Sequence, residues 1–223
     1  MNSPKLIVML TKNDFTVSNA DEIFELCKDS NVKCWGAKED GISEQRLISL
    51  FDSFHKHNKT TFLEVVSYDE SEGIRCAKLA TKCKCDFLLG TKFYKSIADI
   101  CNRNNIKYMP FVGNVRNRPS LLSGEENEIL SETEYCIKNG AYGIDLLGYR
   151  YCGDGYTFSK NIVSKLNIPV CLAGSIDSFE RIDQVLDISP VYFTIGGAFF
   201  DNKFGNDFYK QIELVYNYIN NKF

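Results

Sequence analysis

The sequence has few of the residues that would mark a metal centre or a nucleic-acid-binding surface. It contains only two histidines, His55 and His57, in a lysine-flanked stretch typical of an exposed helix end. Acidic residues outnumber basic ones by 29 to 26, and a formal net charge of −3 leaves no basic stripe for nucleic acid. The apolar run near the N-terminus is too short for a signal peptide or a membrane span. We expect a cytoplasmic protein that binds neither nucleic acid nor membrane.

Cysteine is abundant, but its spacing lacks the pattern of a zinc site or a disulfide framework. Nine cysteines are scattered along the 223 residues, and Cys83 and Cys85 form the only close pair. Without a second pair or a histidine cluster, no tetrahedral set of zinc ligands is complete. We therefore expect buried or incidental thiols, no metal and no cofactor.

Linkers, low-complexity tracts and blocks of like charge are also missing, which predicts one domain over residues 1–223. A composition of 44% apolar and 25% charged residues suits a globular domain with one large core. The longest irregular stretch is 113–124, which contains Arg116 and Arg118. We expect a long loop that covers the site or binds substrate, with its arginines within reach of a second anionic group.

What the chain does contain is a repeated unit of apolar strand and amphipathic helix. Helical spacing follows several of the strands, as in 20–27, 44–51 and 208–216. The strand-like runs recur at intervals of roughly 20–35 residues. They are 6–10, 32–37, 61–66, 87–90, 106–112, 142–147, 168–173 and 191–195.

Apolar strands that alternate with helices predict a parallel sheet covered by helices. Eight such units in this length predict a single compact (β/α)8 TIM barrel. The rival is a doubly wound open sheet, which would normally have a glycine-rich turn after its first strand. Here Thr11-Lys-Asn-Asp14 follows that strand and contains no glycine, so the barrel is favoured.

Glycine and other small residues are concentrated where the last two predicted strands end. Glycine lets the backbone approach a ligand closely, and the N–H groups of a helix start favour an anion. The two turns therefore predict a site for a phosphate group. The alternative is that the glycines serve only tight turns and close packing. The residues concerned are Gly174, Ser175, Gly196, Gly197 and Ala198.

With Ala173-Gly-Ser-Ile176 and Gly196-Gly-Ala198 at these two turns, the chain resembles the ribulose-phosphate-binding barrels. That superfamily contains phosphosugar epimerases, isomerases and small-acid aldolases, and it binds substrate phosphate at these turns. A second likeness, to the keto-deoxy-phosphogluconate aldolases, runs from 86 to 113. Those aldolases carry a Schiff-base lysine on strand six, where this chain reads Gly143-Ile-Asp-Leu-Leu-Gly148 and has no lysine. The resemblance implies a small phosphorylated metabolite as the ligand.

Two carboxylates, Glu64 and Asp145, interrupt otherwise apolar strands. A carboxylate inside a barrel is costly unless it is paired, hydrogen-bonded or protonated, and burial raises its pKa toward the range useful for acid–base catalysis. We expect the two to remove and return a proton on either side of a sugar carbon. The alternative is that one or both pair with a barrel lysine and shape the barrel floor. Thr11 and Lys12 after strand one, and Tyr149 and Arg150 after strand six, are further polar candidates.

Lys38 ends the second strand, and alternation places it on the same face as Cys34 and Gly36. Its ammonium could neutralise an enediolate or a carboxylate, and with a lowered pKa its amine could form a Schiff base. The alternative is an exposed loop lysine beside two acidic residues, Glu39 and Asp40.

The leading hypothesis is a metabolic enzyme that acts on a small phosphorylated sugar or sugar acid by proton transfer next to a carbonyl, as an isomerase or epimerase does. Lys38, Glu64 and Asp145 are its expected catalytic residues. One alternative is a class I aldolase that uses Lys38 or Lys92. Another, of a different class, is a non-catalytic barrel that binds a phosphorylated metabolite.

Aromatic residues near the C-terminus exceed what one outer helix needs to cover a barrel. They indicate either a homo-oligomer interface or packing of helices against the barrel. They are Phe199, Phe200, Phe204, Phe208, Tyr209, Tyr216 and Tyr218.

Overall fold

The apolar segments form parallel strands that close into a barrel in the computed structural model, which describes residues 3–222. The strands of the barrel are β1 (Lys5–Met9), β4 (Cys34–Lys38), β5 (Thr60–Val65), β6 (Phe87–Lys92), β7 (Lys107–Phe111), β10 (Ile144–Leu146), β11 (Val170–Leu172) and β12 (Tyr192–Ile195). Their hydrogen-bonded order is β1-β12-β11-β10-β7-β6-β5-β4, and the pairing of β4 with β1 closes the ring.

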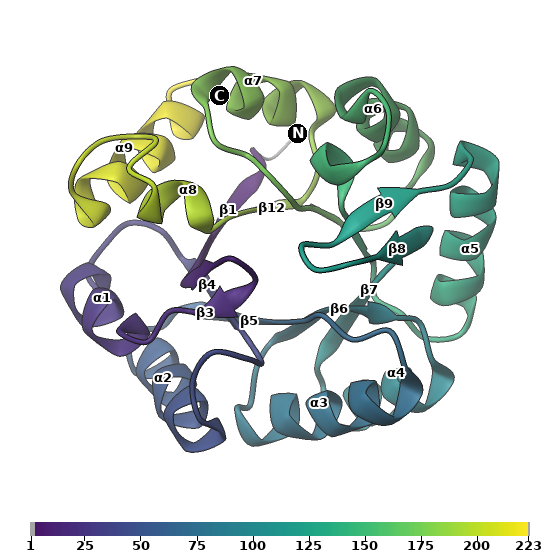
Figure 1. Ribbon diagram of the computed structural model, residues 1–223, viewed down its shortest axis with the longest axis horizontal. Coiled ribbons are helices and arrows are strands. Elements are labelled where there is room, and N and C mark those ends of the chain that lie inside the picture. The colour runs from purple at the N-terminus through teal and green to yellow at the C-terminus, as the bar shows by residue number, and fades with distance from the viewer. Residues whose placement is uncertain (1–2, 223) are drawn as a thin grey trace.

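Helices connect successive strands and surround the barrel (Figure 1). The helices are α1 (Ala20–Cys27), α2 (Glu44–Lys56), α3 (Glu70–Lys82), α4 (Lys95–Arg103), α5 (Glu126–Lys138), α6 (Gly155–Lys165), α7 (Phe179–Ile188), α8 (Gly197–Phe200) and α9 (Phe208–Asn220), with a short 3-10 helix, η1 (Gly148–Arg150). Ser178 caps α7, since its side chain accepts a hydrogen bond from the Arg181 N–H. The predicted (β/α)8 TIM barrel is confirmed.

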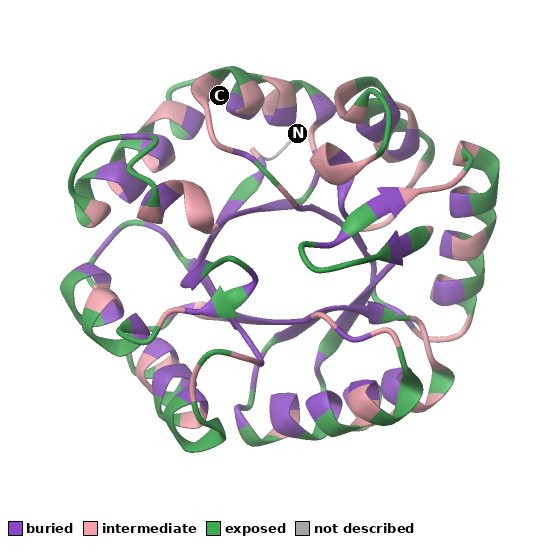
Figure 2. Ribbon diagram, viewed as in Figure 1, coloured by how far each residue is buried: buried purple, intermediate pink, exposed green. Residues whose placement is uncertain are grey.

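The core has two layers because the side chains of each strand alternate between the barrel interior and the helices. Inside the barrel, Phe62 and Phe87 stack with ring centroids 4.4 Å apart, and Tyr192 contacts both rings edge-on at 5.3 Å. Between barrel and helices, Trp35 packs against Phe24 of α1 with centroids 5.1 Å apart. Buried residues accordingly line the barrel and the inner helix faces, while exposed ones lie on the outer faces (Figure 2).

The prediction of an irregular loop at 113–124 is wrong, because most of this stretch forms a β-hairpin. Strands β8 (Asn114–Arg116) and β9 (Leu121–Ser123) pair antiparallel. A second hairpin, β2 (Thr11–Lys12) with β3 (Phe15–Thr16), follows β1 and was not expected. Both hairpins lie over the barrel opening, inside the ring of helices (Figure 1). They narrow the access to the ends of the strands.

The C-terminal aromatic residues pack on one another around α8 and α9. Phe199 lies 5.6 Å from both Phe204 and Phe208, measured between ring centroids. Phe204 also contacts Phe179 of α7 at 5.3 Å. Tyr209 is exposed. Helix packing therefore accounts for most of this cluster, and a homo-oligomer stays a prediction.

The cysteines are free thiols, and eight of the nine are buried, with Cys152 exposed. Burial raises the pKa of Cys34 to about 12, so such thiols are poorly ionised and unreactive at neutral pH. In the described part of the chain, no helix is long and apolar enough to cross a membrane.

Candidate functional site

A cavity of about 270 Å³ opens at the carboxyl-terminal ends of the barrel strands. Its wall is formed by the ends of β1, β4 and β5, by the segments after β10, β11 and β12, and by the tip of the β8–β9 hairpin. This is the end of a (β/α)8 barrel where catalytic side chains gather. The volume lies just below the usual range for drug-sized ligands and suits a small metabolite.

Lys38 is buried at the cavity wall, so the alternative of an exposed loop lysine is wrong. Its side chain is only 6% exposed, and its Nζ lies 2.8 Å from Asp14 Oδ1 and 3.1 Å from Glu64 Oε1. Burial alone would lower the pKa of Lys38, but the charges of Glu64 and Asp14 and their hydrogen bonds raise it above its ordinary value. At neutral pH the group is an ammonium ion.

Glu64 reaches the same cavity from the neighbouring strand. The register of the barrel places Glu64 on β5 beside Lys38 on β4, and both side chains line the cavity. Glu64 therefore pairs with a barrel lysine, which the sequence left as an alternative. Because the pair lies at the cavity wall rather than deeper in the barrel, the contact leaves a carboxylate and an ammonium ion beside the space for a ligand.

Asp14 completes this cluster, and sequence reasoning missed it. It lies in the two-residue turn of the β2–β3 hairpin, where Asn13 and Asp14 have φ of 52° and 64°. Burial alone would raise the pKa of Asp14, but the charge and hydrogen bond of Lys38, with the charges of Arg150 and Arg118, lower it. Asn and Asp both tolerate the positive φ that a two-residue hairpin turn requires, so the Asn13-Asp14 pair could have located the turn.

Asp145 lies behind the cavity wall. Asp145 is 1% exposed, and neither of its carboxyl oxygens has a hydrogen-bond partner among the described residues. Burial, and then the charge of Glu64, raises the pKa of Asp145 well above its ordinary value. Burial therefore favours the protonated, neutral form of Asp145. Within residues 3–222 it does not line the cavity, so the structure does not place it opposite Glu64 across a bound ligand.

The residues predicted to hold phosphate all line the cavity, in the β11 turn (174–175) and the β12 turn (196–198). A Cβ atom at Gly196 would lie 2.7 Å from Thr11 Oγ1, and Gly174 has φ of 92°, so local structure requires both glycines. At Gly197 a Cβ atom would meet nothing within 4 Å. Packing therefore does not explain Gly197, and its N–H has no acceptor within α8 because it begins that helix.

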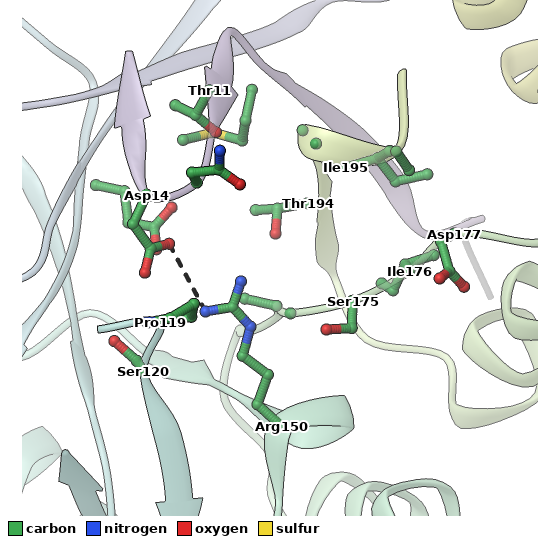
Figure 3. Close-up of a pocket in the computed structure, with 18 of the residues that line it drawn as sticks. Thr11, Asp14, Pro119, Ser120, Arg150, Ser175, Ile176, Asp177, Thr194 and Ile195 are labelled. Carbon is green, nitrogen blue, oxygen red and sulfur yellow. Dashed lines mark ion pairs between the residues drawn. The ribbon is translucent and has the colours of Figure 1, made fainter. Parts of the chain in front are cut away.

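Two acids next to these turns are neutralised by cations. Asp177 pairs with Arg181 at 3.4 Å, and Asp201 pairs with Lys12 at 2.7 Å. In the close-up of the cavity, Asp177 points away from Arg150, and Ser175 lies between them (Figure 3). These ion pairs reduce the repulsion that an anion at the turns would meet.

The other basic residues considered from the sequence divide into two groups. Arg150 lines the cavity, as expected of a polar residue after the sixth strand. Among the described residues, Lys92, Arg116 and Arg118 do not. Arg118, in the β8–β9 hairpin, donates hydrogen bonds to Asp40 at 2.8 Å and to the Asp14 carbonyl oxygen at 3.3 Å, and so joins the two hairpins. In the described chain, no group of three His, Cys, Asp or Glu residues is placed to hold a metal ion.

No family model matches the sequence, and no curated protein does. Solved structures do match the fold. An N-acetylmannosamine-6-phosphate 2-epimerase from Clostridium perfringens is 14% identical, with a TM-score of 0.64 over 87% of this chain and 86% of its own. A 4-hydroxy-2-oxoglutarate/2-dehydro-3-deoxyphosphogluconate aldolase is 12% identical, with a TM-score of 0.65 over 97% and 95%.

A glycerol uptake operon antiterminator regulatory protein from Listeria monocytogenes also matches. It is 13% identical, with a TM-score of 0.60 over 86% of this chain and 91% of its own. The resemblance to the ribulose-phosphate-binding barrels is confirmed at the level of the fold. At these identities the likeness shows the fold alone, and an epimerase, an aldolase and a regulatory protein share it.

The buried acid gives a pH-dependent prediction for stability. Asp145 keeps its proton in the folded state at pH values where the unfolded chain has lost it, so its contribution to stability is full below about pH 4 and declines above. Asp145→Asn removes this titration. We expect the free energy of unfolding of the variant, relative to the natural protein, to rise with pH above about pH 4, by at most about 1.4 kcal/mol per pH unit, until the pH passes the raised pKa of Asp145.

Urea unfolding of both proteins at several pH values between about 4 and 7 measures this difference. A direct effect of the amide on packing would shift the difference equally at every pH. A difference that stays constant across the range would therefore contradict the assignment of Asp145 as a buried neutral acid.

Proposed function

We propose that this chain is an enzyme that transfers a proton next to the carbonyl group of a small phosphorylated sugar or sugar acid. The observation that carries the proposal is the ammonium of Lys38, held 2.8 Å from Asp14 and 3.1 Å from Glu64 at the wall of the cavity. The five turn residues with small side chains line the same cavity. A base, a fixed positive charge and an anion-binding turn are the parts that such a reaction needs.

In the proposed reaction Glu64 acts as the base. Its carboxylate removes the proton from the carbon next to the substrate carbonyl, and the carbonyl oxygen gains the negative charge of an enediolate. Lys38 stabilises that charge, since a fixed ammonium in a water-poor site needs no reorganisation as the charge develops. The hydroxyl proton of the first carbon moves to the former carbonyl oxygen, and Glu64 returns its own proton to the former carbonyl carbon. The first carbon then carries the new carbonyl group, which completes an isomerisation.

Asp145 has a supporting role in this scheme. Because it lies behind the wall, it acts on the substrate through Glu64 and not as a second base on the opposite face of the carbon. A neutral acid at this depth adds no negative charge next to Glu64. With Asp145 outside the cavity, the opposed pair of Glu64 and Asp145 is not formed, which favours isomerisation by Glu64 over an epimerisation that uses that pair.

Schiff-base chemistry is less well supported. A lysine nucleophile must lose its proton, whereas Glu64 and Asp14 raise the pKa of Lys38. The other lysine considered, Lys92, is exposed at the end of β6 and does not line the cavity within the described chain.

Replacement of the base provides the first functional test. The substrate panel consists of phosphorylated ketoses, aldoses and sugar acids in deuterium oxide, and NMR follows exchange of the hydrogen next to the carbonyl. We expect exchange by the natural protein and a loss of about 10²–10⁴-fold in Glu64→Gln, because general-base catalysis contributes about that much. Lys92→Met is the matched control and should exchange at the natural rate.

Three results would contradict the proposal. Undiminished exchange in Glu64→Gln would remove Glu64 as the base. A borohydride-trapped adduct on Lys38 would establish the aldolase alternative. Binding of phosphorylated metabolites by the natural protein, with no exchange of any of them, would indicate a non-catalytic barrel.

Gly197 provides a separate test of the phosphate site. Gly197→Val adds a branched side chain where a Cβ atom meets nothing, so the fold should tolerate it while the side chain blocks access to the β12 turn. We expect the affinity for inorganic phosphate to fall by about tenfold or more, since a hydrogen bond to a charged group contributes about 1.5–3 kcal/mol. Calorimetry measures the affinity, and the urea midpoint serves as the control for folding. Unchanged affinity with an unchanged midpoint would argue against a phosphate at this turn.

A further inference from the structure

Arg150 crosses the cavity between the β11 turn and Asp14. It belongs to η1, and its stem lies against the β11 turn, where a Cβ atom at Gly174 would come within 2.8 Å of its Cγ. At the other end, its Nη1 lies 3.6 Å from Asp14 Oδ1. The side chain is 24% exposed and lines the cavity. Figure 3 shows it reaching from the side of Ser175 toward Asp14.

The guanidinium of Arg150 has no hydrogen-bond acceptor within residues 3–222. Its distance of 3.6 Å from Asp14 is that of an ion pair and exceeds the range of an N–H···O hydrogen bond. The same oxygen of Asp14 already accepts a hydrogen bond from Lys38 at 2.8 Å. A guanidinium carries five N–H donors in a rigid planar fork that matches the oxygens of a carboxylate or phosphate. These donors are directed into a cavity of about 270 Å³.

Neighbouring arginines have partners of their own. Arg118 donates to Asp40 and to the Asp14 carbonyl oxygen. Arg181 donates to the Ser175 carbonyl oxygen and pairs with Asp177. Arg150 differs from both. The methylene groups of its side chain pack against the β11 turn and so position its half-buried guanidinium, whose N–H donors have no acceptor among the described residues.

We propose that Arg150 binds an oxyanion of the substrate, either a phosphate or a carboxylate group, through the fork of its guanidinium and so selects for acidic substrates. The inference rests on the proposed function only in taking this cavity as the substrate site. Since Arg150 and Lys38 share Asp14, an oxyanion on Arg150 lies next to the Lys38 ammonium. Such an anion fixes the substrate relative to Glu64, whose carboxylate lies on the other side of Lys38.

Isothermal titration calorimetry with inorganic phosphate and with glycolate, a small monocarboxylate, tests the proposal on the natural protein and three variants. Arg150→Met removes both the positive charge and the planar set of N–H donors. Arg150→Lys keeps the positive charge but lacks the planar donors. Arg116→Met removes a charge from an exposed side chain of the β8–β9 hairpin that does not line the cavity. Unfolding midpoints confirm that each variant is folded.

We expect Arg150→Met to lose about tenfold or more in affinity for at least one of the two anions, as for a lost hydrogen bond to a charged group. Arg150→Lys should be intermediate and Arg116→Met unchanged. Loss of phosphate binding identifies a phosphate ligand, and loss of glycolate binding identifies a carboxylate.

Natural affinity for both anions in Arg150→Met would overturn the proposal. An equal loss in Arg116→Met would also do so, because it would indicate a general effect of charge, and so would a natural protein that binds neither anion. The result is independent of turnover. Binding that depends on Arg150, together with no proton exchange by the natural protein, would refute the proposed reaction and leave the anion site standing.

Discussion

The site depends on the ammonium of Lys38 held between two buried carboxylates. A buried charge is tolerated only when it is paired, and removing one partner of a buried ion pair costs about 3–5 kcal/mol. The ion pairs with Lys38 therefore keep Asp14 and Glu64 at the cavity wall, and the same ion pairs keep the Lys38 ammonium there. Asp14 comes from a hairpin outside the barrel, so the same contact fastens that hairpin over the opening. Arg118 joins the second hairpin to the first through Asp40 and the Asp14 carbonyl oxygen.

The barrel could be predicted from the sequence because its strands are continuous apolar runs at regular intervals, and the pairing of Lys38 with Glu64 follows from the adjacency of their strands. The two turns rich in small residues also meet because β11 and β12 are neighbours. The position of Asp14 could not be predicted in this way, since it depends on a two-residue turn folding back over the barrel. How far Asp145 lies from the cavity depends on the register of β10 with its neighbouring strands. The periodicity along a single strand does not predict that register.

A barrel of this kind does not specify a reaction, because an epimerase, an aldolase and a regulatory protein have the same fold. The protonation states of the site are more informative. An ammonium on Lys38 suits the stabilisation of an enediolate and opposes the nucleophilic role of an aldolase lysine. Burial and the charge of Glu64 raise the pKa of Asp145, whereas the cations around Asp14 lower its pKa, so these two neighbouring carboxyl groups differ because their surroundings differ.

The proposed site requires Lys38 to be an ammonium ion at the cavity wall. Nitrogen-15 NMR of the lysine side chains tests it directly, with Lys38 assigned by comparison with Lys38→Met and the chemical shift of its Nζ followed as the pH is raised. We expect this nitrogen to stay protonated to about pH 10, because two carboxylates raise its pKa above that of a free lysine. Loss of the proton below about pH 8 would show that Lys38 is not held as an ammonium ion, since it would make Lys38 a competent nucleophile and return the site to Schiff-base chemistry.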